Sequence, residues 1–584
     1  MPKNKVNLSK AEQAIREEIF SLLSVALNQK VKPQDWEISY PPESKLGDYA
    51  VPCFLLSKKL KISPVQAATD LAKKIKTVKL VEKVQAVGPY LNFFVNRSEV
   101  SKLVLTQIYK DKDQYGSSKV GKGSKVMIEF FSPNANKPLT IGHVRNIALG
   151  QALTNLFRFT SHKVITSTLY NDRGIAIIKA ILGYQKWSDA KTPKEVGMKP
   201  DHFVGSFYVK FSQAEEKDKN LENEAKRALQ AWEEDDPKIR KIWQKLMSWV
   251  YDGFKQTLKK LEVENFDEEY YENEFYTKGR DLVEQGFAQG IFKKHQDGYI
   301  FAPLEKFGLP DKVLLRSDGT SLYITQDMYL AALKNKHNID HSIYVIGSEQ
   351  DLQMQQLFKI LELLKFDNLK KLYHLSYGMV RLPAGKIKSR QGLAKGTSAD
   401  DIIMELENLA QAEIKSRFPD ITERDLEKRT AAIALAAIKF YILSVNPKST
   451  MVFEPKKSIS FVGKTGPYLQ YTYARISSLF EKTDIKVTAK VDFSKIISDE
   501  EFDLVKTLSR FPEIISLSLK NYDPSKLAVY LHDLAKKFSL FYETMPVLKS
   551  DEKTKSARLL LVHDTRIVLA TGLALLGIKP IEQM

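Results

Sequence analysis

Residues 126–159 constrain the fold of this chain more than any other stretch, because a strand pattern passes through one short loop into a helix pattern. The strand pattern is VMIEFF at 126–131, and apolar residues recur near helical spacing from 143 to 159. The loop between them reads SPNANKPLTIG. A strand, a tight loop and a helix in this order open an α/β layer with a parallel sheet.

Two more strand and helix pairs follow, at 163–169 with 175–182 and at 342–346 with 353–364. Between them, residues 186–262 are charged and mostly helical, which is typical of an insertion. The predicted fold class is therefore α/β, with a Rossmann-like parallel-sheet domain at its centre.

The flanking sequence predicts two further units. Residues 84–95 resemble two strands around a turn at Gly88 and Pro89, which favours an N-terminal α+β domain, and the polar run 110–125 is expected to be a linker. Helical patterns dominate from Ala399 onward, so the C-terminal part is expected to be an all-α helical bundle. The expected boundaries are 1–112 for the N-terminal domain, 124–385 for the sheet domain with its insertion, 386–450 for a loop and connecting helices, and 451–584 for the bundle.

Charge gives the first indication of a partner. The 584 residues contain 89 Lys and Arg against 71 Asp and Glu, a net charge of +18. A basic excess of this size suits a large nucleic acid, although a Lys-rich composition serves solubility equally well.

The single cysteine, Cys53, excludes a disulfide framework and a thiolate zinc site, so no metal centre is predicted. The first residues lack the apolar segment of a secretory signal. The two most apolar stretches, 431–445 and 559–578, are interrupted by charged residues. We therefore expect a cytoplasmic protein that does not enter a membrane.

The loop after the first strand has the chemistry of a phosphate site. The amino end of the following helix directs backbone N–H groups and a positive dipole outward. Gly142 allows close approach, His143 can donate to a phosphoryl oxygen, and Lys137 supplies positive charge. The alternative is a tight turn followed by a histidine with a structural role. The predicted nucleotide-binding residues in this loop are Ser132, Pro133, Asn134, Lys137, Gly142, His143 and Asn146.

Glu129 is a carboxylate within an apolar strand. Strand alternation puts it on one face with Met127 and Phe131, so a cation must meet it unless it lies at the solvent end of the sheet. Tyr323 and Asp327 are four residues apart, and if Thr325 caps a helix, Asp327 lies in its first turn. Complementing the helix dipole is the alternative role for Asp327.

Three segments carry a resemblance to one family. SPN-x-x-K with T-I-G-H resembles the HIGH signature of class I aminoacyl-tRNA synthetases in the form found in arginyl-tRNA synthetases. The segments 316–327 and 461–475 are similar to the same family, and the similarity covers nearly the whole chain. Thr140 departs from the family pattern, which usually has His there, so His143 is expected to do more of the phosphate binding.

The resemblance implies the activity: ATP-dependent activation of L-arginine to arginyl-adenylate, with Mg²⁺ arriving with ATP, and transfer to tRNA(Arg). It also implies that tRNA binds before the first step, that the N-terminal domain contacts the tRNA elbow and that the bundle binds the anticodon. We expect a monomer. The alternatives are a non-catalytic RNA-binding paralogue, a related nucleotidyltransferase, and a class I synthetase for another amino acid.

The resemblance also implies the site residues. GKIKSRQG at 385–392 resembles the second signature, KMSKS, with Lys386 and Lys388 toward the nucleotide. Two carboxylates suit a planar guanidinium with its fork of donors. The implied catalytic residues are Lys137, Thr140, Gly142, His143 and Lys386, and the implied arginine ligands are Glu129, Asn134, Tyr323, Asp327 and Gln350.

Two further groups have weaker signals. Asn171 and Asp172 follow a strand and resemble a family loop near the adenosine, although a plain turn explains them too. Tyr468, Tyr471 and Arg475 place aromatic rings beside a cation, which can stack unpaired tRNA bases, and core packing is the alternative.

Overall fold

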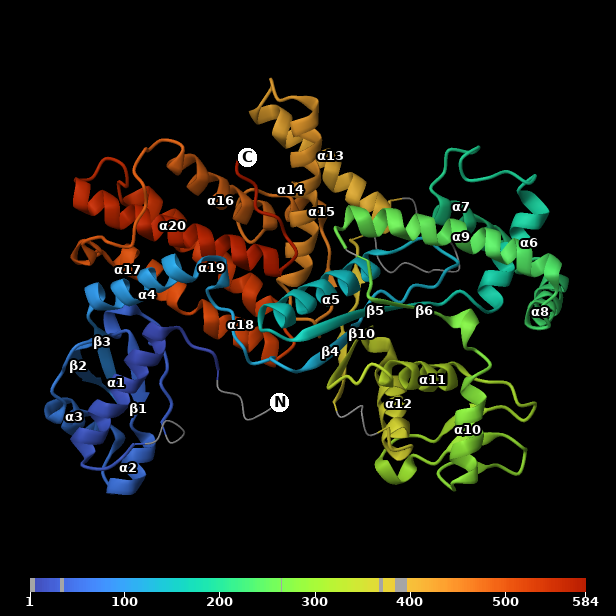
Figure 1. Cartoon of the computed structure of the whole chain (residues 1–584), viewed down its shortest axis with the longest axis horizontal. Coiled ribbons are helices and arrows are strands. Elements are labelled where there is room, and N and C mark those ends of the chain that lie inside the picture. The colour runs from blue at the N-terminus through green and yellow to red at the C-terminus, as the bar shows by residue number, and fades with distance from the viewer. Residues whose placement is uncertain (1–5, 32–35, 264, 367–370, 384–395) are drawn as a thin grey trace.

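The computed structural model describes residues 6–31, 36–263, 265–366, 371–383 and 396–584. Figure 1 shows a central sheet with the N-terminal domain and the C-terminal helices to one side of it and a helical insertion to the other. This arrangement of a parallel sheet, an N-terminal α+β domain and a C-terminal helical bundle confirms the predicted fold class.

The N-terminal domain packs helices against a three-stranded antiparallel sheet of order β1-β3-β2. The expected strand pair around Gly88 is present as β2 and β3. Its elements are α1 Lys10–Leu27, β1 Tyr49–Pro52, α2 Phe54–Leu60, α3 Pro64–Lys74, β2 Val81–Val87, β3 Tyr90–Val95 and α4 Arg97–Asp111.

The expected linker at 110–125 is not a free connection. Tyr115 is 1% exposed, its ring stacks on Phe511 and its hydroxyl donates to the carbonyl of Leu508 at 3.1 Å. Tyr115 thus fixes this segment against the C-terminal bundle. The polar residues around it gave no sequence pattern that would have predicted this packing.

The central sheet has five parallel strands in the order β11-β10-β4-β5-β6. Their carboxyl ends meet at one edge, and the chain reverses its direction of winding at β4, which is where ligands bind in such sheets. The strands and the helices that flank them are β4 Lys125–Glu129, α5 Ile141–Phe159, β5 Lys163–Tyr170, α6 Ile175–Trp187, β6 Glu268–Tyr271, α11 Tyr323–Asn335, β10 His341–Gly347, α12 Asp351–Leu363 and β11 Leu372–Tyr377.

Two segments interrupt this layer. The predicted helical insertion comprises α7 Pro200–Glu215, α8 Asn220–Glu233 and α9 Pro237–Lys260. A second unit was not predicted: after α10 Gly279–Ala288, a small antiparallel sheet forms from β7 Lys293–Lys294, β8 Ile300–Ala302 and β9 Lys312–Leu315. Its strands are too short for alternation to reveal them in the sequence.

The C-terminal half is helical, as expected. A short parallel pair, β12 Val380–Arg381 with β13 Met451–Val452, joins it to the sheet domain. Among the described residues, no helix is long and apolar enough to cross a membrane. The helices are α13 Ala399–Arg417, α14 Glu423–Leu443, α15 Pro455–Ser458, α16 Gly466–Phe480, α17 Asp499–Ser509, α18 Phe511–Lys520, α19 Ser525–Thr544 and α20 Glu552–Leu575.

Candidate active site

A cavity of about 810 Å³ lies at the carboxyl edge of the central sheet. Its walls come from the loop after β4, the start of α5, the loop after β5, the start of α11 and the loop after β10. The structure therefore brings together segments that are up to about 220 residues apart. The predicted residues that line the cavity are Glu129, Ser132, Asn134, Lys137, Thr140, Gly142, His143, Asn146, Tyr323, Asp327 and Gln350.

Of the residues predicted for the catalytic, nucleotide and arginine sites, Pro133 is described but does not line the cavity. Pro133 is buried, and its carbonyl accepts a hydrogen bond from the Asn171 N–H at 3.1 Å. Lys386 and Lys388 lie outside the described residues.

Thr140 is the N-cap of α5 and fixes the orientation of His143. The Thr140 N–H donates to His143 Nδ1 at 3.0 Å, and the Thr140 hydroxyl lies 2.9 Å from the same nitrogen. Because Nδ1 accepts, the neutral ring carries its proton on Nε2. The hydroxyl at this position thus contacts the histidine ring.

The groups of this loop can bind an anion without an imidazolium. Burial and the nearby charge of Lys137 lower the pKa of His143 to about 4, so its ring is neutral at neutral pH. Burial also lowers the pKa of Lys137. The Nε2–H of His143, the Lys137 amine and the amino end of α5 can all serve an anionic group in the cavity.

Asn146 and Arg145 on α5 hold the backbone around the cavity. Asn146 Nδ2 donates to the Val345 carbonyl at 2.6 Å, and its Oδ1 accepts from the Phe131 N–H. The fully buried Arg145 donates to four carbonyl oxygens within 2.8–3.1 Å. Those carbonyls belong to Gly378, Asn446, Pro447 and Ser449.

The strand alternation ends earlier than the sequence suggested. Phe131 has a positive φ of 63° and packs with Phe254 and Phe266, whereas Met127 lies in a different apolar cluster. A left-handed residue turns the chain, so the prediction that Phe131 shares a face with Met127 and Glu129 was wrong.

The cation that meets Glu129 belongs to the chain. Lys334 Nζ on α11 forms an ion pair with Glu129 Oε2 and lies 4.3 Å from the centre of the Tyr344 ring. The side chains of Glu129 and Lys334 are 5% and 0% exposed. Burial alone would lower the pKa of Lys334, but the charge of Glu129 outweighs it and raises that pKa.

Asp327 has no such partner. Gln353 Nε2 donates to its Oδ2 at 2.9 Å, and no ion pair of the described residues includes it. Burial, reinforced by the charge of Glu129, raises the pKa of Asp327 to about 6. The cavity thus combines a carboxylate on α11 with groups on the loop before α5 that can donate to an anion.

Thr325 does not cap the helix that carries Asp327. Leu322 is the N-cap, and the buried Thr325 hydroxyl donates to the Leu314 carbonyl at 2.6 Å. Asp327 therefore lies in the second turn and faces the cavity, so the alternative role in complementing the helix dipole was wrong.

Three family models match the chain. They are "tRNA synthetases class I (R), catalytic domain" over 104–454, "DALR anticodon binding domain" over 469–584 and "Arginyl tRNA synthetase N terminal domain" over 9–95. The chain belongs to the arginyl-tRNA synthetase family. The resemblance drawn from the sequence is therefore confirmed, as is the enzyme class, an aminoacyl-tRNA ligase, and the alternatives are not favoured.

Relatives match along nearly their whole length. The arginine–tRNA ligase of Treponema denticola is 39% identical over 95% of this chain and 96% of its own, and that of Treponema pallidum is 39% identical over 93% and 94%. The solved arginyl-tRNA synthetase of Thermus thermophilus is 25% identical, has a TM-score of 0.77 and covers 98% of this chain and 100% of its own.

Several charged residues of the cavity and its surroundings were not predicted from the sequence. Glu272 and Arg173 also line the cavity, and burial raises the pKa of Glu272 to about 7 although Arg173 opposes this shift. Lys334 could have been found, because it lies seven residues after Asp327 and thus on the same helix face.

Asp172 has a structural role in this synthetase. It is fully buried and accepts hydrogen bonds from the Tyr251 hydroxyl at 2.7 Å, the Asn273 N–H at 2.9 Å and Asn273 Nδ2 at 2.6 Å. Its carboxylate ties the helical insertion to the end of β6, so a direct role in ligand binding is wrong. Asn171 does line the cavity.

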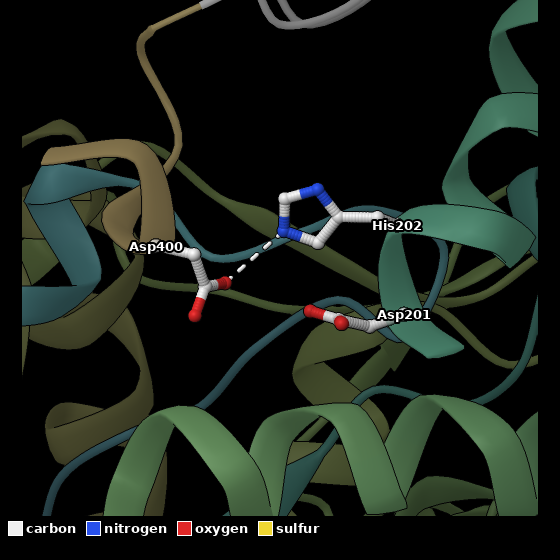
Figure 2. A group of neighbouring side chains, drawn as sticks. All are labelled: Asp201, His202 and Asp400. Carbon is white, nitrogen blue, oxygen red and sulfur yellow. Dashed lines mark hydrogen bonds and ion pairs between the residues drawn. The ribbon is translucent and has the colours of Figure 1, made fainter. Parts of the chain in front are cut away.

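Asp201, His202 and Asp400 cluster where the insertion meets α13 (Figure 2). His202 Nε2 lies 3.0 Å from Asp400 Oδ2, and Lys199 Nζ lies 2.8 Å from Asp201 Oδ1 and 3.0 Å from Asp400 Oδ2. Burial would raise the pKa of Asp400, but His202 and Lys199 hold it at about 2. The Lys199 ammonium already compensates these carboxylates, so the cluster joins two elements and does not require a metal.

The predicted tRNA-binding residues lie on α16, outside the cavity. Tyr468 shares a hydrogen bond with Ser539 at 3.0 Å. Arg475 Nη2 donates to the Tyr471 hydroxyl at 2.9 Å, and its guanidinium lies 4.8 Å from the centre of that ring. All three are half-buried, so part of each side chain packs and part faces solvent.

Proposed function

We propose that the cavity activates L-arginine with ATP to give arginyl-adenylate and then transfers the arginyl group to tRNA(Arg). The observation that carries this proposal is the polarity of the cavity. The Asp327 carboxylate on α11, without an ion-pair partner among the described residues, lines the same cavity as Lys137 and His143 of the loop and start of α5. Such a cavity can hold a guanidinium and a triphosphate at the same time.

In the first step, a carboxylate oxygen of arginine attacks the α-phosphorus of ATP in line. The bond from that phosphorus to the bridging oxygen breaks, and pyrophosphate leaves with the electron pair. Lys137 and the amino end of α5 stabilise the charge, and His143 donates Nε2–H to a phosphoryl oxygen. Mg²⁺ enters with ATP as part of that substrate.

In the second step, a hydroxyl of the terminal ribose of tRNA attacks the activated carbonyl, and AMP leaves. No protein nucleophile is required in either step, so the enzyme contributes position and electrostatics. Ser132, Asn134, Gly142 and Asn146 shape the nucleotide side of the cavity. Lys386 and Lys388 are proposed to approach the phosphates from the segment outside the described residues.

The arginine side chain is proposed to bind between Asp327, Tyr323 and Gln350, with Asn134 and Glu129 completing the pocket. Tyr323 is 70% exposed at the start of α11, where its ring can cover the aliphatic part of the substrate. A planar fork of donors distinguishes arginine from lysine at the Asp327 carboxylate.

The remaining units are proposed to bind tRNA. Residues 451–584 would take the anticodon, with Tyr468, Tyr471 and Arg475 stacking against bases, and residues 1–112 would contact the elbow. The excess of 18 positive charges supports a polyanionic partner. We propose a monomer that works in the cytoplasm and forms the adenylate only with tRNA bound.

ATP–pyrophosphate exchange on the purified protein tests this function. We expect exchange with arginine in the presence of tRNA(Arg), none with lysine, and a strongly reduced but measurable kcat/KM for arginine in Asp327→Asn, whose neutral amide cannot pair with a guanidinium. Exchange with lysine equal to that with arginine would contradict the substrate. Absence of exchange with every amino acid, with tRNA still bound, would contradict the catalytic function.

A further inference from the structure

The loop that carries Lys137 is held from outside the cavity by the start of α13. Thr140, at the carboxyl end of the loop, forms an antiparallel bridge with Ser398, the residue before α13. The Ala399 N–H donates to the Leu139 carbonyl at 2.8 Å. The backbone beside the cavity is therefore paired with a segment about 260 residues further along the chain.

Helix α7 of the insertion packs against the same loop. Gly205 on α7 is buried, and a Cβ atom at this position would lie 2.8 Å from Pro138 Cδ and 3.3 Å from Lys137 Cα. A glycine allows a helix backbone to approach this closely. The loop thus contacts both α7 and the start of α13, while the side chain of Lys137 lines the cavity.

The cluster of Asp201, His202 and Asp400 joins these two elements to each other (Figure 2). Lys199 is the N-cap of α7, His202 lies in the first turn of that helix, and Asp400 lies in the first turn of α13. His202 Nε2 and Lys199 Nζ each lie 3.0 Å from Asp400 Oδ2. The Thr257 hydroxyl on α9 donates to Asp400 Oδ1 at 3.1 Å.

These partners give Asp400 a role beyond its place at a helix start. Complementing the dipole of α13 would require none of them. The Asp400 side chain is 14% exposed, so a carboxylate there depends on the cations of α7. Breaking these contacts would separate the two elements that hold the loop.

We propose that Asp400, with Lys199 and His202, is a positioning residue for adenylate formation: it holds α7 against the start of α13 and thereby fixes the place of Lys137 in the cavity. The inference rests on the proposed function, and it deepens that function by assigning residues outside the cavity to the placement of a phosphate-binding group. Within the described residues, no ion pair or hydrogen bond holds the Lys137 ammonium, so its position depends on the backbone that carries it.

ATP–pyrophosphate exchange with tRNA(Arg), measured at varied ATP and varied arginine, tests this assignment. Asp400→Asn keeps the size of the side chain but removes the charge that attracts Lys199. We expect kcat to fall by about tenfold or more, because a displacement of about 1 Å is costly, while the KM for arginine stays within about twofold of the wild type. Glu407→Gln is the matched control and should keep the wild-type kcat. Glu407 lies two turns further along α13 and pairs with Lys260 of α9 at 3.9 Å.

A double-mutant cycle with Lys137→Met decides whether the cluster acts through Lys137. If it does, Asp400→Asn costs less than about threefold in the Lys137→Met enzyme, because the group that it displaces is already absent. Single-turnover adenylate formation keeps these slow variants measurable. The full tenfold loss in the Lys137→Met background overturns the proposal, since the cluster would then act by another route. Equal kcat for the wild type and Asp400→Asn overturns it as well.

Gly205→Ala tests the same role from α7 and replaces Asp400→Asn if that variant does not fold. Its methyl group pushes against Pro138 without changing any charge, so kcat should fall by about tenfold, and again by less than about threefold in Lys137→Met. Melting temperatures report folding separately. A wild-type enzyme without arginine-dependent exchange would refute the proposed function, whereas an active wild type with additive losses refutes only the positioning role of Asp400.

Discussion

At the scale of single residues, two groups that line the pocket differ in their protonation state near neutral pH. His143 has a pKa of about 4 and is neutral near pH 7, while Asp327 has a pKa of about 6 and is mostly ionised there. The neutral ring donates from Nε2 because Thr140 occupies Nδ1. The charge of the His143 ring therefore stays constant across neutral pH, whereas the charge of Asp327 changes as pH falls toward 6.

This difference predicts a pH profile. As pH falls below about 6, Asp327 takes up a proton and loses the charge that pairs with the guanidinium, so kcat/KM for arginine falls. The measurement is kcat/KM for arginine from pH 5 to pH 8 in wild type, Asp327→Asn and Glu272→Gln. The acid limb should vanish in the first variant and persist in the second, although Glu272 titrates nearby, at about 7. An acid limb unchanged in Asp327→Asn would contradict the assignment.

The Thr140 hydroxyl gives a second prediction at this scale. Thr140→Val removes the hydroxyl contact with His143 but keeps the backbone N–H bond to Nδ1. We expect the rate of adenylate formation to fall by about tenfold, the usual effect of one polar contact, and Thr140→Ser to retain the wild-type rate. Single-turnover adenylate formation measures it, and equal rates in Val and Ser variants would exclude the contact from the mechanism.

At the scale of elements, α5 does more than direct its amino end at the nucleotide. Through Arg145 it binds the carbonyl of Gly378, which precedes β12, and three carbonyls of the loop that precedes β13. β4 leads into α5, and α5 in turn binds the start of the C-terminal half. One buried guanidinium thus supplies donors that the local backbone lacks.

Loss of these donors should destabilise the whole sheet domain. Arg145→Met leaves four buried carbonyls without this donor, and we expect a loss of about 3 kcal/mol in unfolding free energy, seen as a lower melting temperature. Arg145→Lys should recover part of the loss, because an ammonium cannot span all four acceptors. Equal melting temperatures for wild type and Arg145→Met would contradict this role.

The same elements show what sequence can and cannot predict. The strand and helix pairs around β4, β5 and β10 were predictable because their periodicity is local. The Glu129 and Lys334 pair joins residues 205 apart, so the sequence required a cation for Glu129 but could not tell substrate from protein. The turn at Phe131 and the anchor at Tyr115 depend on tertiary packing, which no local pattern encodes.

At the scale of the whole molecule, the N-terminal domain lies beside the C-terminal bundle (Figure 1), and polar side-chain contacts join the two units. Arg97 pairs with Asp499 at 2.5 Å and Lys506 with Asp48 at 2.9 Å. The buried Glu12 accepts from the Ser509 hydroxyl at 3.1 Å. The two units proposed to bind tRNA therefore contact each other directly.

A buried lysine joins the other end of the bundle to the active-site helix. Lys439 on α14 donates to Gln151 Oε1 on α5 at 2.7 Å and to the carbonyl of Gly577, after α20, at 2.8 Å. Burial lowers its pKa to about 7, well below the value of about 10.4 for an unfolded chain. Between these two pH values the unfolded state binds the extra proton, so linkage makes the contribution of Lys439 to stability rise with pH.

This pH dependence of stability can be measured against a variant that lacks the lysine. Relative to Lys439→Met, the wild type should gain stability as pH rises from about 7 toward 9, by up to about 1.4 kcal/mol per pH unit for one fully titrating group. The difference in melting temperature between the two proteins, measured across this range, reports it. Because both proteins share every other titrating group, the comparison isolates Lys439. A difference that stays constant or narrows with pH would show that the lysine remains charged in the folded enzyme, and that its two acceptors outweigh burial.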